Sequence, residues 1–174
     1  MVGPREAGVI WSRHILNCAA LVPMVGEPQP VIDVGSGAGL PGIVLALADP
    51  SRQITLVEPM ARRCAFLADV VAELALDQVE IVQARAEECA GTLSAGTVVA
   101  RAVAPLIRLV PMALPLVRPG GQLLAIKGAA AERELAEAAD VLRRHDAQAR
   151  ICPVAAPGTV ARTTVVRVVL TPRG

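Results

Sequence analysis

A glycine-rich turn is the first feature of the sequence that points to chemistry. Residues 31–42 read VIDVGSGAGLPG, in which an apolar run leads into Gly35, Gly37, Gly39 and Gly42. Glycine weakens the interior of helices and strands, so this density predicts a turn where the backbone must approach a ligand closely. The free N–H groups at the start of a following helix favour electronegative atoms. The stretch therefore predicts a site for a nucleotide-like cofactor.

An acidic residue further along the chain strengthens this prediction. Glu58 follows Gly39 by 19 residues and comes directly after the apolar run ITLV. An acid at this position can accept hydrogen bonds from both hydroxyls of a ribose. The alternative is that Glu58 only favours the N-terminus of the next helix, where Pro59 suits the first turn. Loop and acid together favour adenosine binding.

Two classes of cofactor fit the loop. Gly37, Gly39 and Gly42 satisfy GxGxxG, the pattern of dinucleotide-binding proteins, which is weak by itself. The stretch from Asp33 to Gly39 also reads DxGxGxG, which resembles the first motif of S-adenosylmethionine-dependent methyltransferases. Asp33 would hold the amino-acid end of that cofactor or brace the loop. The chain has no tyrosine and only two histidines for hydride chemistry, which favours the methyl donor.

The elements that would position these residues alternate along the chain. Short apolar runs predict strands, and longer stretches with helical spacing predict helices. The expected strands are 30–34, 53–57, 79–83, 97–103, 121–126, 149–155 and 163–170, and the expected helices are about 4–21, 41–48, 60–75, 105–117 and 130–144. This alternation predicts a mostly parallel sheet with helices on both faces, whose last two strands pair antiparallel at one edge. Ligands bind beyond the carboxyl ends of parallel strands, where the loop and Glu58 would meet.

Composition limits the class of protein. The chain has 174 residues, of which 53% are hydrophobic and 19% charged, so we expect one globular α/β domain over 1–174, with residues 1–25 as an N-terminal helix packed on the core. The charge-free stretches are shorter than the ~18 residues of a membrane span, and no export signal is visible, so we expect a cytoplasmic protein with no membrane partner. We expect no metal site, because four scattered cysteines form no CxxC pair: Cys18, Cys64, Cys89 and Cys152.

Seven segments, in order along nearly the whole chain, resemble a single family. They are WSRHILNCA (11–19), VIDVGSGAGLPGIVLALA (31–48), ITLVEPMARRCAFL (54–67), ARAEE (84–88), VVARAVAPL (98–106), LLAIKG (123–128) and TTVVRVV (163–169). Together they resemble the guanine-N7 methyltransferases of small-subunit (16S) ribosomal RNA. The GLPG, ARA and LLAIKG segments distinguish this resemblance from one to methyltransferases in general.

The resemblance implies a fold and a reaction. The fold would be that of class I S-adenosylmethionine-dependent methyltransferases, with a seven-stranded, mostly parallel sheet whose last strand is antiparallel. The donor would be S-adenosyl-L-methionine, which becomes S-adenosyl-L-homocysteine, and the acceptor a guanine of the small-subunit RNA, free or in an assembling subunit. Family members usually carry further N-terminal helices before the segment that begins here near Gly3, so we expect a shortened N-terminus.

The resemblance also assigns cofactor contacts to four segments. The loop would contact the methionine end and the sulfur, and the acid after the second strand would bind the ribose. Two residues after the third strand would meet the adenine, and an arginine after the fourth strand would line the place where cofactor and target base meet. In this sequence the loop residues are Gly35, Ser36, Gly37, Gly39 and Leu40, and the others are Glu58, Ala86 and Glu87, and Arg101.

Methylation at guanine N7 would depend on alignment of the reactants. N7 carries a lone pair and no proton, so its attack on a sulfonium methyl group needs no general base. Arg101 would orient the edge of the guanine or a nearby phosphate, or instead form an ion pair that braces the Glu87 region. Lys127 is the single lysine among 17 basic residues, and it would contact RNA or the target base, or be a solvated charge at a strand end.

The means of RNA recognition are less evident. Aromatic side chains commonly stack on unpaired bases, yet this chain has only Trp11 and Phe66, and we expect Phe66 in the core. His14 and Asn17 share one predicted helical face, which the resemblance places near the cofactor site, or they only cap and brace the helix. Arg62 and Arg63, in a first helical turn, would bind phosphate or be simple solvated charges. A basic rim for the RNA has four candidates, which are Arg5, Arg13, Arg108 and Arg162.

Two other functions remain open from the residues. A methyltransferase for another RNA or a small molecule would share the loop but not the basic rim. A dinucleotide-binding module that senses or regulates would explain the glycines and Glu58 without catalysis. A preference for S-adenosylmethionine over NAD would exclude the second of these.

Overall fold

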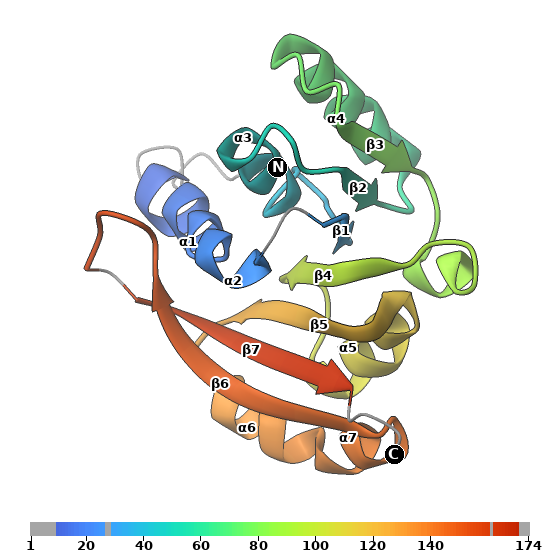
Figure 1. The fold of residues 1–174 in the computed structure, drawn as a ribbon, viewed down its shortest axis with the longest axis vertical. Coiled ribbons are helices and arrows are strands. Elements are labelled where there is room, and N and C mark those ends of the chain that lie inside the picture. The colour runs from blue at the N-terminus through green and yellow to red at the C-terminus, as the bar shows by residue number, and fades with distance from the viewer. Residues whose placement is uncertain (1–9, 27–28, 161, 171–174) are drawn as a thin grey trace.

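The protein is built on one seven-stranded sheet (Figure 1). The computed structural model describes residues 10–26, 29–160 and 162–170. The strands lie in the order β3-β2-β1-β4-β5-β7-β6, and β7 is antiparallel to both of its neighbours, whereas β1 to β5 are parallel. The strands are β1 Val31–Val34, β2 Ile54–Val57, β3 Val79–Val82, β4 Ala95–Arg101, β5 Val117–Lys127, β6 Ala147–Ala155 and β7 Arg162–Leu170. The predicted architecture, including the antiparallel last strand, is confirmed.

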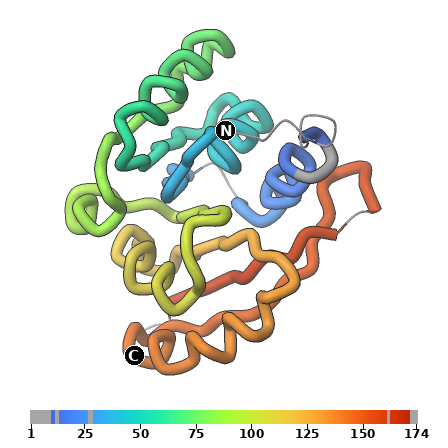
Figure 2. The backbone as a smooth tube through the Cα atoms, turned by 180° about the vertical axis from the view of Figure 1, so that it is seen from behind, coloured from blue at the N-terminus to red at the C-terminus, as the bar shows by residue number. Residues whose placement is uncertain are grey.

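Helices cover both faces of this sheet. α1 to α4 pack on one face, and α5, α6 and α7 pack on the other, where Figure 2 shows them in front of the sheet. The helices are α1 Leu16–Ala19, α2 Val22–Val25, α3 Gly42–Ala48, α4 Ala61–Glu73, α5 Leu106–Ala113, α6 Ala131–Glu137 and α7 Ala139–Arg144, with a π-helical turn at Trp11–Ile15 and 3-10 turns at Ala86–Cys89 and Leu114–Leu116. The central strands are buried on both sides, which explains their continuous apolar sequences.

Two predicted helices have different bounds in the structure. The segment 105–117 ends its α-helix at Ala113 and continues as a 3-10 turn, and β5 already begins at Val117. The segment 130–144 forms two helices, α6 and α7, because Ala138 between them has a ψ angle of −1°. This dihedral angle interrupts the helix at Ala138. No proline or glycine stands there, so the alanine-rich sequence did not predict the break.

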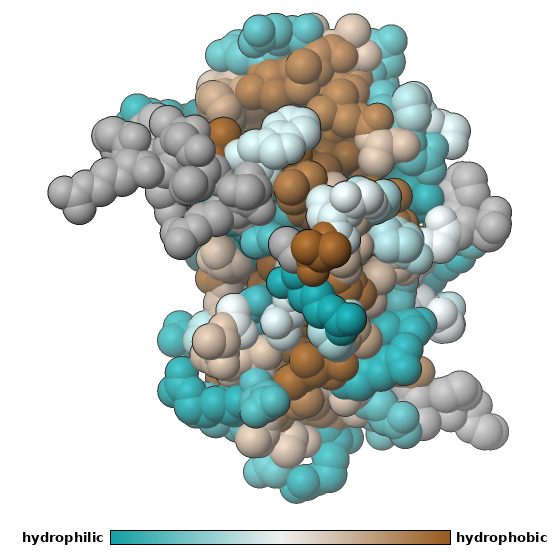
Figure 3. All heavy atoms as spheres, turned by 90° about the vertical axis from the view of Figure 1, so that its left-hand side faces the viewer, coloured by the Kyte–Doolittle hydropathy of each residue, from teal (hydrophilic) through white to brown (hydrophobic). Residues whose placement is uncertain are grey.

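The prediction that Phe66 belongs to the core is wrong. α4 packs beside β3, the edge strand of the sheet, and among its residues only Leu67 is fully covered. The Phe66 side chain is 45% exposed, and Leu74 at the end of the helix is similarly exposed. Figure 3 shows the resulting apolar area in the upper part of the molecule, where α3 and α4 lie.

The N-terminal segment packs on the core, as far as the structure describes it. Cys18, Leu21 and Val25 are buried in the same cluster as Val31 and Leu124 of the sheet. Residues 1–9 of the predicted N-terminal helix, including Arg5, lie outside the described residues. No helix in the described ranges is long and apolar enough to cross a membrane.

Candidate functional site

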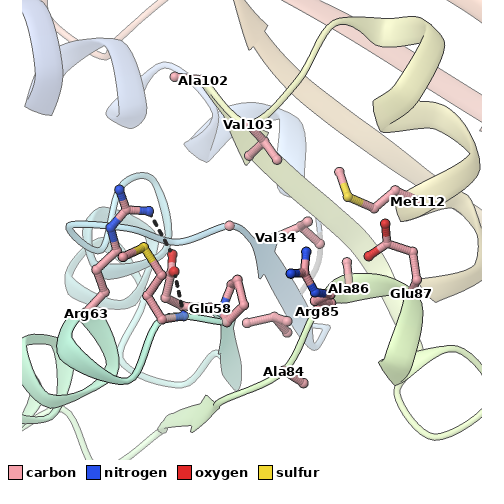
Figure 4. Close-up of a pocket in the computed structure, with 14 residues that line it drawn as sticks. Val34, Glu58, Arg63, Ala84, Arg85, Ala86, Glu87, Ala102, Val103 and Met112 are labelled. Carbon is pink, nitrogen blue, oxygen red and sulfur yellow. Dashed lines mark hydrogen bonds and ion pairs between the residues drawn. The ribbon is translucent and has the colours of Figure 1, made fainter.

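The ends of the first four strands enclose a pocket of about 280 Å³ (Figure 4). Its floor is formed by Val34 at the end of β1, Gly35 directly after it and Glu58 after β2, and one wall by the segment from Ala84 to Glu87 after β3. The opposite wall is formed by Ala102 and Val103, which follow β4, and Met112 of α5 adds an apolar contact. The pocket thus lies at the carboxyl edge of the parallel strands, where this class of sheet binds ligands.

Close packing explains two of the glycines in the loop. An added Cβ on Gly42 would lie 2.3 Å from Leu56 Cδ2 and 2.8 Å from Asp33 Oδ2, so only glycine lets α3 pack this closely on β1 and β2. An added Cβ on Gly35 would lie 2.8 Å from Val103 Cγ2, across the floor of the pocket. Around Gly37 no atom would come nearer than 3.7 Å, so the loop stays open there.

Asp33 braces the loop from below. Its carboxylate is fully buried, and Oδ2 accepts a 2.8 Å hydrogen bond from the backbone N–H of Gly42. The Ser36 hydroxyl donates to the backbone oxygen of Asp33 at 2.8 Å. Of the two roles considered for Asp33, this geometry matches bracing of the loop. Its Oδ1 is buried and has no hydrogen-bond partner within the described part of the chain.

The buried carboxyl group of Asp33 makes a testable link between stability and pH. Burial raises its pKa from 3.8 to about 7, against the lowering effect of the hydrogen bond from Gly42. Between these two values the folded protein binds more protons than the unfolded chain, so the free energy of unfolding falls as the pH rises. We expect urea denaturation to show that wild type loses stability relative to Asp33→Asn between pH 5 and pH 8. A difference in the free energy of unfolding between the two proteins that stays constant over this range would contradict a raised pKa for Asp33.

Glu58 lies at the centre of the pocket and holds the loop. Its side chain is only 1% exposed; Oε2 accepts from the Gly37 N–H at 3.0 Å and Oε1 from the Met60 N–H at 3.0 Å. The Arg63 Nη1 lies 3.5 Å from Oε2 (dashed in Figure 4). Arg63 therefore belongs to the pocket, whereas its neighbour Arg62 does not line it. The Glu58 carboxylate thus holds the glycine loop through Gly37 as well as the start of α4 through Met60.

Arg101 reaches toward the N-terminal segment. Its Nη2 contacts His14 Nδ1, and its Nη1 lies 3.7 Å from Cys18 Sγ. These contacts join β4 to the start of α1, across more than 80 residues of sequence. The alternative of an ion pair with the Glu87 region finds no support, because among the described residues Arg101 contacts His14 and Cys18 and forms no ion pair.

A second, larger pocket adjoins the first. It measures about 490 Å³ and shares Ala102 and Val103 with the first pocket, so the two spaces lie on either side of the turn after β4. Arg101, Lys127 and Glu134 are its charged lining residues. A cofactor in the first pocket and a flat base in the second would therefore meet at this turn.

Lys127 is held inside the protein by two contacts. Its Nζ lies 2.8 Å from Glu134 Oε2 and donates a 2.6 Å hydrogen bond to the backbone oxygen of Ala104. The Lys127 side chain is 9% exposed, so the alternative of a solvated charge is wrong. Glu134 also accepts from the Leu106 N–H at the start of α5. Burial raises the pKa of Glu134, but the hydrogen bonds from Lys127 and Leu106 outweigh it and keep this pKa below its usual value.

Removal of the Lys127 charge tests this bracing role. Lys127→Met leaves Glu134 without its partner, so we expect the free energy of unfolding to fall by about 2–3 kcal/mol. The double variant Lys127→Met with Glu134→Gln should recover part of that loss, because no unpaired charge remains. Chemical denaturation of both variants measures the difference. If the double variant is stable yet transfers methyl groups slowly, Lys127 has a role in the reaction as well.

The structure brings together part of the predicted cofactor site. Gly35, Glu58, Ala86 and Glu87 line the first pocket, and Arg101 lines the second. The other predicted residues belong to β1 and the loop after it but are not among the lining residues of the first pocket; they are Asp33, Ser36, Gly37, Gly39 and Leu40. The pocket residues that the sequence analysis did not identify are Val34, Val57, Pro59, Met60, Ala84, Arg85, Ala102, Val103 and Met112. Most of them adjoin predicted residues, and only Met112 comes from a helix face that carried no signal.

Other predicted contacts stay apart from the pockets. Asn17 accepts a 2.9 Å hydrogen bond from the Thr163 hydroxyl and so ties α1 to β7. Arg108 and Arg162 are exposed, on α5 and at the start of β7. Within the described part of the chain, no three His, Cys, Asp or Glu side chains gather in a way that would hold a metal ion.

Solved structures share this fold at low sequence identity. The glycopeptide N-methyltransferase MtfA matches with a TM-score of 0.70 and 18% identity, over 96% of this chain and 100% of that one. The ribosomal protein L11 methylase of Lactobacillus delbrueckii subsp. bulgaricus matches with a TM-score of 0.69 and 14% identity, over 90% and 77% of the two chains. The fold is therefore that of the class I methyltransferases.

Sequence relatives are much more similar. The protein called ribosomal RNA small subunit methyltransferase G in Kineococcus radiotolerans is 51% identical over 171 residues, which are 97% of this chain and 67% of that protein. The protein of the same name in Thermobifida fusca is 48% identical over 172 residues, 98% of this chain and 73% of that protein. The family described as rRNA small subunit methyltransferase G matches residues 1–160. This chain belongs to the rRNA small subunit methyltransferase G family.

Proposed function

We propose that the chain transfers a methyl group from S-adenosyl-L-methionine to N7 of a guanine in small-subunit ribosomal RNA. The observation that carries the proposal is the pocket at the carboxyl edge of the sheet, in a chain of this family, with buried Glu58 at its centre. The proposed localisation is the cytoplasm, where the RNA would be methylated free or in an assembling subunit.

The residues of the first pocket fit the donor. A carboxylate has about four acceptor positions, of which Glu58 uses three for Gly37, Met60 and Arg63, so one remains for a ribose hydroxyl. Ala86 and Glu87 form the wall beside it, where the adenine would lie, and the open backbone at Gly37 gives room for the methionine end. When bound there, S-adenosylmethionine would supply an electrophilic methyl group.

The second pocket fits an acceptor that needs no base. Lys127 and Glu134 neutralise each other, which leaves Arg101 as the charged side chain that can turn toward a base. A guanidinium group donates to O6 and N7 of guanine in other contexts, and here it would hold the O6 edge so that N7 faces the donor. Because N7 carries no proton, this positioning suffices, and the protein needs no proton acceptor at the site.

Nucleoside analysis tests the proposal. The purified chain would be incubated with S-adenosylmethionine that carries a labelled methyl group and with undermethylated small-subunit RNA, either free or in subunits. We expect the label in 7-methylguanosine after complete digestion of the RNA. Label in another nucleoside would contradict the N7 assignment, and absence of label from RNA in both forms would contradict the substrate class.

A further inference from the structure

A basic surface lies at the opposite end of the sheet from the two pockets. Arg150 of β6 stands directly opposite Arg167 of β7, and Arg167 stands opposite Leu124 of β5. Directly opposed residues share a face of the sheet, and Leu124 belongs to the cluster on the side of α1 to α4. α6 and α7 pack on the other side, so Arg150 and Arg167 point away from them.

A third arginine completes this surface. Arg118, at the start of β5, lies over Gly96, where an added Cβ would be 3.3 Å from the guanidinium carbon and 3.0 Å from Gln29 Oε1. A pocket of about 190 Å³ is lined by Arg118, Arg167 and Gln29, and a neighbouring pocket of about 290 Å³ by Arg150 and Arg167. Arg167 is the link between these two spaces. We call Arg118, Arg150 and Arg167 the arginine triad.

The triad carries uncompensated positive charge. Like charges directly opposite one another destabilise a sheet, yet Arg150 and Arg167 face each other in adjacent strands. In the described ranges no carboxylate pairs with the three arginines, and no acidic residue lines either of the two pockets. Among the residues that the structure describes, the buried Arg167 Nε has no hydrogen-bond partner, which is costly unless a ligand supplies one. An anion bound at this surface would offset this positive charge.

We propose that the arginine triad binds phosphates of the ribosomal RNA backbone, as a contact separate from the one at the target guanine. Arginine is suited to phosphate because its planar fork donates two parallel hydrogen bonds. No aromatic side chain lines the two pockets within the described residues, so the surface would hold the backbone and not stack on bases. This inference rests on the proposed function, since it names a further contact with the same RNA.

The spacing suits one continuous RNA. Gln122 lines the pocket of Arg118, whereas Lys127 lines the pocket proposed for the target base, and both belong to β5. Five residues of strand at about 3.3 Å each place Gln122 roughly 17 Å from Lys127 along β5. That distance corresponds to a few nucleotides, so the triad can fix the position of the RNA while its target base reaches the donor. Phosphate contacts position a nucleic acid in this way without reading its sequence.

Salt-dependent binding tests the role of the triad. Filter binding would measure the affinity of undermethylated 16S ribosomal RNA for wild type and for Arg118→Gln with Arg150→Gln, two exposed positions where folding should not suffer. Arg144→Gln is the matched control, since Arg144 is an exposed arginine on α7, on the other side of the sheet. We expect the double variant to bind RNA at least about tenfold more weakly. Its slope of log affinity against log salt should be smaller by about 0.7–0.9 per lost contact.

The outcomes separate this inference from the proposed function. Affinity and salt slope equal to those of the Arg144→Gln control would overturn the triad as an RNA contact. A calorimetric titration with inorganic phosphate adds a second measurement: phosphate binding that is lost in the double variant while RNA affinity is unchanged would also overturn it, in favour of a small-anion site. Failure of wild type to methylate the RNA would instead contradict the proposed function, because RNA binding by the triad is measured without methyl transfer. The affinity for S-adenosylhomocysteine should stay within about twofold in the double variant, since its pocket lies at the other end of the sheet.

Discussion

Arg101→Ala should reduce methyl transfer by about 100-fold while the affinity for S-adenosylhomocysteine changes only a few-fold. The magnitude is that of a misplaced reactant, because Arg101 is proposed to orient the guanine and not to bind the donor. Arg101 lines the pocket proposed for the base, whereas Glu58 and Glu87 line the pocket proposed for the donor. Single-turnover rates with saturating RNA and a calorimetric titration would measure the two quantities.

The contacts of Arg101 with the N-terminal segment offer another explanation for a loss of activity in Arg101→Ala, which is a purely structural role. If Arg101 only holds His14 and Cys18 in place, its loss should lower the melting temperature and the cofactor affinity together. Arg101→Lys keeps the charge but loses the planar fork, so it should recover stability more than rate. Arg144→Ala, a change at an exposed arginine of α7, controls for a general effect of net charge. An unchanged transfer rate in Arg101→Ala would refute the orienting role.

Gly42→Ala should destabilise the protein by about 1–3 kcal/mol and weaken cofactor binding strongly. The added methyl group would lie 2.3 Å from Leu56 Cδ2 and 2.8 Å from Asp33 Oδ2, inside a core with no free space. α3 must then move away from β1 and β2, which breaks the hydrogen bond from the Gly42 N–H to Asp33. Because that bond fixes the loop above the pocket, cofactor affinity falls together with stability.

A second glycine provides the control for this effect. Gly128→Ala adds the same methyl group where no atom lies within 4 Å, and its φ is not positive. We expect urea denaturation to give a free energy of unfolding within about 0.5 kcal/mol of wild type for this variant. Equal stability of the two alanine variants would show that α3 packs less tightly than the structure implies.

The sequence predicted those parts of the fold that depend on local pattern. The apolar runs identified all seven strands, and the glycine loop and Glu58, predicted to share one cofactor site, lie together, with the Gly37 N–H donating to Glu58. The strands follow from the pattern of apolar residues, and the meeting of the loop with Glu58 follows because the carboxyl ends of parallel strands lie at the same edge of the sheet. They need no knowledge of which distant segments pack together.

What the sequence could not predict depends on contacts between distant segments. The meeting of Arg101 with His14 joins residues far apart in the chain, and no pattern near either one signals it. The opposition of Arg150 and Arg167 depends on the register of β6 against β7, which the loop between them does not determine. Lys127 and Glu134 are close in sequence, yet their ion pair depends on the turn between β5 and α6. Exposure of Phe66 likewise follows from the position of α4 beside an edge strand.

The most direct test of the central claim is a calorimetric titration of the purified chain with S-adenosylhomocysteine and, separately, with NAD. We predict that wild type binds S-adenosylhomocysteine and not NAD. Glu58→Gln keeps the shape of the side chain but removes its charge, so it should weaken binding roughly 10- to 100-fold. Binding of NAD in place of S-adenosylhomocysteine, or equal affinity in Glu58→Gln, would contradict the assignment of this pocket to a methyl donor.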